Sequence, residues 1–108
     1  MRIVISEFIS LDGVVQAPGG AEEDTDGGFR HGGWSMPFFD PEVMGSATLS
    51  RALFAADLVD EVLLMIEPII LGGGKRAFPD DGEARRFDLL SAKTTATGVQ
   101  VCHYQRAA

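Results

Sequence analysis

Apolar residues in this 108-residue chain fall into short runs separated by polar, glycine-rich stretches. The run over residues 2–9 contains three consecutive β-branched residues, Ile3-Val4-Ile5, which predicts a strand buried on both faces over its first half. Three later runs also favour strands, at residues 59–71, 86–94 and 98–106. We expect the 59–71 strand to be bent or interrupted at Pro68, because proline cannot donate to a ladder. Ala96-Thr97-Gly98 predicts a hairpin between the last two strands, since glycine supplies a positive φ.

One helix is predicted between the first two strands, over residues 41–57. Asp40-Pro41 is a typical helix start, with Asp as N-cap and Pro at the first helical position. An apolar stripe follows at helical spacing: Leu49, Ala52, Leu53 and Ala56. A strand–helix–strand unit of this size predicts a right-handed crossover between parallel strands. The expected fold class is therefore α/β: a small mixed sheet with a β-α-β crossover and a C-terminal β-hairpin, in a single domain over residues 1–108.

The segment between residues 10 and 39 has no sustained periodicity and is rich in Gly, Pro and acidic residues. A loop of this length in a small domain is usually functional or disordered. Its acidic cluster, residues 22–26, is interpreted as a solvated loop tip. A metal site is the alternative, but the cluster lacks the spacing and the glycine of a calcium loop, so we assign no metal ligand.

The net charge of −7 disfavours binding to nucleic acid or to an anionic membrane surface. The longest apolar run, residues 62–66, has the length of a strand rather than of a membrane span. No signal-peptide pattern precedes the first strand. Cys102 is the only cysteine, which excludes an internal disulfide and makes the reducing cytoplasm the expected location.

Two blocks of the sequence resemble the dihydrofolate reductase-like family that includes the riboflavin-biosynthesis reductase domain. The opening block contains Ser10-Leu11-Asp12-Gly13 and Gly32-Gly33-Trp34-Ser35. The closing block contains Gly45-Ser46-Ala47-Thr48-Leu49, Leu58-Val59-Asp60-Glu61 and residues 68–76, PIILGGGKR. Family members carry a long stretch between these blocks that is absent here. The resemblance therefore implies a shortened dihydrofolate reductase-like fold.

The resemblance also implies an activity: NADPH-dependent hydride transfer to a small heterocyclic substrate. The substrate would be pterin- or aminopyrimidine-like, as for dihydrofolate reductase or 5-amino-6-(5-phosphoribosylamino)uracil reductase. Asp12 would orient or protonate the substrate, while Trp34 and Phe38 would wall its pocket. The alternatives stay open: Asp12 as a turn residue before Gly13, and Trp34 as a core residue.

The cofactor would contact two segments if the resemblance holds. Val14 and Val15 belong to the loop that lines the nicotinamide pocket in the family. The turn at Gly45, Ser46, Ala47 and Thr48 corresponds to the one that approaches the pyrophosphate, where a helix N-terminus favours an anion. Gly45 could instead be a kink within one helix. Because the absent stretch holds the adenosine end in the family, the alternative function is a catalytically inactive homodimeric relative that binds a small ligand or none.

The predicted half-sheet leaves one edge of its first strand and one sheet face without a covering element. Ile3, Val4, Ile5 and Phe8 are too apolar for a solvated edge. Burying them at about 25 cal/mol per Å² over several hundred Å² would supply several kcal/mol. We therefore expect a homodimer in which the first strands of two copies meet or exchange places.

Overall fold

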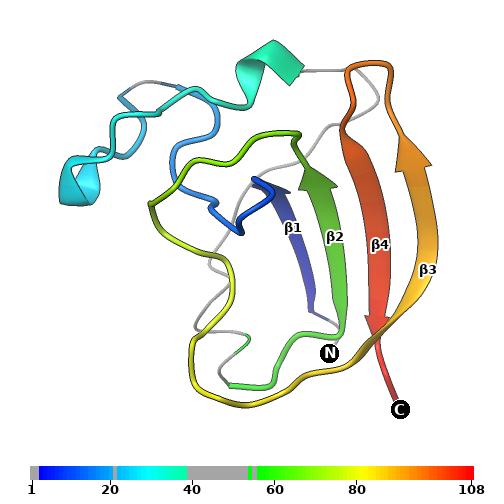
Figure 1. Cartoon of the computed structure of the whole chain (residues 1–108). Helices are drawn as coiled ribbons and strands as arrows, with labels where there is room; N and C mark the ends of the chain where they lie inside the picture. The colour runs from blue at the N-terminus through cyan, green and yellow to red at the C-terminus, as the bar shows by residue number, and fades with distance from the viewer. Residues whose placement is uncertain (1–2, 21, 39–53, 55) are drawn as a thin grey trace.

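The structure, a computed structural model, describes residues 3–20, 22–38, 54 and 56–108. Four strands form one sheet in the order β1-β2-β4-β3 (Figure 1). β1 and β2 run parallel, whereas β4 runs antiparallel to both of its neighbours. The strand bounds are β1 Val4–Ile9, β2 Glu61–Ile66, β3 Phe87–Thr94 and β4 Gln100–Arg106. The small mixed sheet, the parallel first pair and the C-terminal hairpin are therefore confirmed.

The predicted helix over residues 41–57 lies almost entirely outside the described residues. Phe54 is helical and packs in the core beside Ile5 and Val62. The Asp57 N–H donates to the Phe54 carbonyl at 3.0 Å, and Asp57 has a φ of 55°. A residue in this left-handed region is common at a helix end, although glycine is the usual one.

The interruption expected near Pro68 is confirmed, because β2 ends at Ile66, but the predicted continuation of this strand to residue 71 is wrong. Pro68 has no N–H to donate. The Ile69 N–H donates to the Glu67 carbonyl at 2.8 Å, which closes a three-residue turn. The Leu71 N–H donates to a side chain, the Asp12 carboxylate, at 3.1 Å. Residues 67–77 therefore form a loop whose backbone groups bond locally or to the loop after β1.

The long loop after β1 contains two single turns of 3-10 helix that the sequence pattern did not predict. These are η1, Asp26–Gly28, and η2, Met36–Phe38. Figure 1 shows this loop and the loop after β2 gathered at the carboxyl ends of β1 and β2. The opposite end of the sheet carries the start of β1 and the end of β4. The functional predictions for the opening block all fall at the loop-bearing end.

The core lies mainly on one face of the sheet. Ile5 packs there with Phe54, Val59 and Val62. Val4 is 50% exposed, so the prediction that the first half of this strand is buried on both faces is wrong. Ile5 and Val4 point to opposite faces because side chains alternate along a strand, and β1 forms an edge of the sheet among the described residues.

A smaller cluster covers the other face near the loops, where Met65 and Val99 pack against Phe38. The hairpin forms as predicted, with Gly98 at a φ of 89° and the Thr95 N–H donating to the Val99 carbonyl at 2.9 Å. Over the ranges that the structure describes, no helix is long and apolar enough to cross a membrane.

Candidate functional site

The loops after β1 and β2 pair with each other at the end of the sheet where both parallel strands finish. Val14 and Arg76 form an isolated antiparallel bridge. The Val15 N–H donates to the Lys75 carbonyl at 2.8 Å, and the Ala77 N–H donates to the Gly13 carbonyl at 3.0 Å. In open sheets with parallel strands, ligands bind beyond the carboxyl ends of the strands. These loops are therefore the candidate site.

Asp12 joins the two loops through its carboxylate. Oδ1 accepts hydrogen bonds from the Ser10 hydroxyl at 2.6 Å and the Leu71 N–H at 3.1 Å, and Oδ2 accepts one from the Gly72 N–H at 2.9 Å. The Ser10 hydroxyl, followed by the two backbone donors, lowers the pKa of Asp12 to about 2. The turn interpretation is confirmed, because Gly13 has a φ of 85° and its N–H donates to the Ser10 carbonyl. A role of Asp12 toward a substrate stays a prediction.

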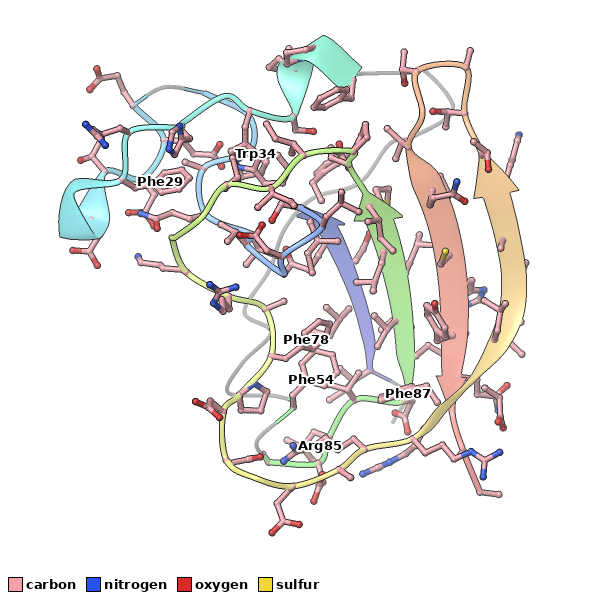
Figure 2. The ribbon with its side chains drawn as sticks, viewed as in Figure 1. Phe29, Trp34, Phe54, Phe78, Arg85 and Phe87 are labelled. Carbon is pink, nitrogen blue, oxygen red and sulfur yellow. The ribbon has the colours of Figure 1, made fainter. Side chains whose placement is uncertain are left out.

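Gly74 lets the loop after β2 pack closely on the loop after β1. Its φ of 119° disfavours any L-residue side chain. A Cβ at this position would lie 2.8 Å from the side chains of both Val14 and Phe29. Figure 2 shows Phe29 pointing into this loop cluster. The glycine-rich sequence GGGK therefore has a packing role at its third glycine.

Val14 and Trp34, predicted to line a ligand pocket, lie in the core of the loop cluster. Val14 is fully buried and packs with Trp34 and Leu71. The Trp34 Nε1–H donates to the Gln16 carbonyl at 2.8 Å, and the side chain is 5% exposed (Figure 2). The core interpretation of Trp34 is therefore confirmed. Contacts of Val14, Val15 and Trp34 with a ligand stay predictions.

Phe38 and Trp34 belong to neighbouring clusters that meet at Phe8, which packs against both. Phe38 is half-buried against Met65 and Val99. Its carbonyl accepts a hydrogen bond from the Thr97 hydroxyl at 2.7 Å, which connects η2 to the β3–β4 hairpin. The two aromatic residues therefore lie at the same end of the sheet, and a shared pocket wall stays a prediction.

Glu67, which the sequence reasoning missed, is the most unusual group at this end of the sheet. It follows β2 directly and is 1% exposed. The Ser35 hydroxyl donates to Oε1 at 2.5 Å, while Oε2 has no hydrogen-bond partner among the described residues. Burial raises the pKa of Glu67 to about 7, although the Ser35 hydrogen bond lowers it. The available signal was an ionisable residue inside the apolar run MIEPIIL.

Lys75 is already neutralised by the acidic loop tip. Its Nζ lies 2.7 Å from Asp24 Oδ2 and 3.4 Å from Asp26 Oδ2. The Asp24 hydrogen bond raises the pKa of Lys75, and its counterpart lowers the pKa of Asp24. The Arg76 guanidinium donates to the Asp12 carbonyl. Lys75 and Arg76 therefore bond to the loops themselves, and this explains both cations without an anionic ligand.

A pocket of about 260 Å³ opens between these loops. Its lining residues are Gln16, Asp26, Gly27, Phe29, Gly74 and Lys75. The volume is below the roughly 300–1,000 Å³ of most ligand sites, and the Asp26 carboxylate would repel a phosphate. The pocket therefore does not fit a whole NADPH. The predicted pyrophosphate turn, Gly45 to Thr48, lies outside the described residues, so the structure gives no geometry for it.

Metal binding has no support in the described part of the chain. No group of three or more His, Cys, Asp or Glu side chains there is arranged to hold a metal ion. Asp24 and Asp26 from the acidic cluster instead bind Lys75.

One comparison with a known structure identifies the same fold. A putative riboflavin biosynthesis protein from Shewanella sp. PV-4 superposes with a TM-score of 0.65 at 12% identity, covering 100% of both chains. A pyrimidine reductase-like protein from Corynebacterium diphtheriae gives a TM-score of 0.48 at 24% identity over 55% of this chain. RibD from Acinetobacter baumannii gives 0.46 at 29% identity over 59%. This chain spans only 25% and 19% of those last two proteins.

Sequence comparison gives the family directly. No curated protein matches the chain, but the sequence model of the RibD C-terminal domain matches residues 42–101. That match contains β2, β3 and the start of β4, and it leaves β1 with its long loop outside. Because it spans more than half of the 108 residues, this chain belongs to the RibD C-terminal domain family.

Proposed function

We propose that this chain is a reductase that transfers a hydride to a small heterocyclic substrate of the pterin or aminopyrimidine kind. The substrate would bind beyond the carboxyl ends of β1 and β2. Family membership supports the reaction class. The observation that carries the proposal is the buried Glu67–Ser35 pair, a carboxyl group that follows β2 at the end of the sheet where ligands of parallel sheets bind, although it does not line the loop pocket.

The reaction needs a proton as well as a hydride, because reducing a C=N bond adds the hydride to carbon and the proton to nitrogen. NADPH, the cofactor that the family resemblance implies, supplies the hydride when it is bound. Glu67 holds the proton, since a general acid works best when its pKa lies near the operating pH, and the pKa of Glu67 is about 7. Ser35 orients the carboxyl group through its 2.5 Å hydrogen bond.

Asp12 has a different part in this proposal. With a pKa of about 2 it stays ionised, so it holds the two loops in register and keeps a negative charge beside the site. The proposed cofactor contacts are Val14, Val15 and the turn from Gly45 to Thr48. The loop pocket, at about 260 Å³, has room for only part of such a cofactor. Cytoplasmic location suits this role, since the lone Cys102 is a buried free thiol.

NADPH oxidation with candidate substrates tests the proposal. The purified chain is assayed with 5-amino-6-(5-phosphoribosylamino)uracil and with dihydrofolate, and turnover of one of them is expected. We expect kcat/KM to fall above about pH 7, where Glu67 loses its proton. Glu67→Gln should lower kcat by about 10²-fold or more and abolish that pH dependence. Glu83→Gln, at an exposed carboxyl group outside the site, is the control and should leave both unchanged.

A second function has one specific observation in its favour. The poor fit of the loop pocket to NADPH suits a catalytically inactive homodimeric relative that binds a smaller ligand or none. Titration of NADPH, followed by its fluorescence, separates the two functions. Saturable binding below roughly 100 μM, which corresponds to about 5.5 kcal/mol, supports the reductase. A folded chain that shows no saturation and no turnover supports the inactive relative.

A further inference from the structure

The two outer strands of the sheet differ in how well their edges resist pairing with another strand. β3 has a bulge between Leu89 and Ser91 and carries the charged residues Asp88 and Lys93. Bulges and charges of this kind protect a sheet edge. β1 pairs with β2 in unbroken register from Val4 to Ile9 and has no bulge. Its one charged residue, Glu7, is fully buried, so it puts no charge in solvent at the free edge.

Backbone hydrogen bonds show which residues of β1 face that free side. The Ile3 carbonyl accepts from the Glu61 N–H at 3.1 Å, and the Ile9 carbonyl accepts from the Glu67 N–H at 2.8 Å. In a parallel strand, successive residues direct their backbone groups to alternate sides. The odd-numbered residues therefore bond to β2. Val4, Ser6 and Phe8 direct their N–H and C=O groups to the free edge, where no strand pairs with them among the described residues.

We propose that β1 pairs with β1 of a second copy of this chain, antiparallel about a two-fold axis at Ser6, so that two sheets become one. Only residues whose backbone groups face the partner can form hydrogen-bonded pairs. Centring the axis on Ser6 pairs Ser6 with the partner's Ser6 and Val4 with the partner's Phe8. The outward N–H and C=O groups of Val4, Ser6 and Phe8 then all have partners, with two hydrogen bonds in each pair.

The neighbouring registers are less favourable. An axis at Glu7 places two carboxyl side chains opposite each other and leaves Val4 beyond the paired segment. An axis at Ile5 leaves Phe8 beyond the segment formed by β1. A register that pairs even-numbered with odd-numbered residues fails altogether. The backbone groups of the odd-numbered residues already bond to β2, so no hydrogen-bonded ladder can form with the partner.

Side chains on the less covered face fit the register centred on Ser6. Val4 is 50% exposed and Phe8 is half-buried. Each would lie opposite the other across the new interface, and β-branched–aromatic pairs stabilise antiparallel strands. The dimer therefore covers Val4, the apolar residue that the single chain leaves exposed on this strand.

Disulfide cross-linking tests both the dimer and its register. In a Cys102→Ala background, which removes the only native thiol, Ser6→Cys places two thiols on a hydrogen-bonded pair about 5.5 Å apart between Cα atoms. That separation allows a disulfide. Mild oxidation should therefore give a covalent dimer of twice 11.6 kDa, at least 10-fold faster than for the control Ser91→Cys on the β3 edge.

Light scattering at micromolar concentration gives an independent measurement and should report a dimer for the unmodified chain. Ser6→Pro removes one outward N–H and keeps the β1–β2 bonds, so it should yield a folded monomer by circular dichroism, whereas Ser6→Ala should stay dimeric. A monomeric unmodified chain would overturn the proposal. Faster cross-linking through Glu7→Cys than through Ser6→Cys would overturn the register, and faster cross-linking through Ser91→Cys would overturn the choice of edge.

Discussion

Asp12 and Glu67 lie at the same end of the sheet, each just after one of the two parallel strands, yet their carboxyl groups behave oppositely. Asp12 accepts three hydrogen bonds, and its pKa falls to about 2. Glu67 accepts one from Ser35 and is buried, and its pKa rises to about 7. The number of hydrogen-bond donors, set against the cost of desolvation, therefore decides the pKa of each carboxyl group. It determines whether the group is ionised or holds a proton near neutral pH.

The two groups also hold different parts of the chain together. Asp12 joins the loop after β1 to the loop after β2, together with the Val14–Arg76 bridge and the close approach of Gly74. Glu67 instead connects the end of β2 to Ser35, just before η2. Substitutions can therefore disturb one connection and leave the other in place.

The largest expected effect comes from Gly74→Ala, in the connection that Asp12 organises. The new methyl group meets Val14 and Phe29 at 2.8 Å, and the φ of 119° opposes any side chain. Overpacking and backbone strain together predict a loss of about 4 kcal/mol in the free energy of unfolding. Gly73→Ala is the matched control, because nothing lies within 4 Å of its Cβ position. Urea unfolding of both variants measures the difference, and equal losses would show that the loops relax around the added methyl group.

Asp12→Ala should cost about 3 kcal/mol, because it leaves two backbone N–H groups and the Ser10 hydroxyl without their acceptor. Its control is Asp24→Ala, which breaks only exposed contacts, the pair with Lys75 and the hydrogen bond from the Asp26 N–H, and should cost much less. The loss in the Asp12 variant should disappear in strong acid. The lowered pKa means that this stabilisation is present above pH 3.8 and lost as the pH falls toward 2. A loss that is the same at pH 2 and pH 7 would contradict the electrostatic account.

Glu67 should give a pH dependence of the opposite sign. Its folded pKa of about 7 lies above the ordinary 4.5, so the folded chain keeps the proton that the unfolded chain releases. Stability is therefore full below about pH 4.5 and falls as the pH rises through 7, by about 3 kcal/mol. Glu67→Gln should remove this slope and unfold at a higher urea concentration than the unmodified chain at pH 8. Equal slopes in the two proteins would show that another group titrates.

The sequence predicted the four strands, the parallel first pair and the C-terminal hairpin because those features depend on local pattern. Alternation, the hairpin at Gly98 and the crossover rule need no knowledge of distant contacts. The turn at Asp12 was foreseen as an alternative because Asp before Gly is a local signal. Its bonds to Leu71 and Gly72 were not, since those donors lie about sixty residues away.

The missed features all depend on which segments meet in space. Ser35 and Glu67 are 32 residues apart, and nothing in either segment alone indicates that they pair. The end of β2 near Pro68 was expected from the proline, but only the tertiary structure reveals that the Asp12 carboxylate accepts the Leu71 N–H. Val4 was predicted buried because its run is apolar, whereas burial depends on what covers that face.

Ser35→Ala has the smallest expected effect and separates the two influences on Glu67. Losing the hydroxyl removes one hydrogen bond, which predicts a cost of about 1 kcal/mol. Since the Ser35 hydrogen bond lowers the pKa of Glu67 against the effect of burial, its removal should raise that pKa further. The pH at which stability stops falling should then move above 7. Urea unfolding between pH 4 and pH 9 measures this shift, with Ser91→Ala on β3 as an exposed control. An unchanged curve would show that burial alone sets the pKa of Glu67, and a shift to lower pH would contradict the contact with Ser35.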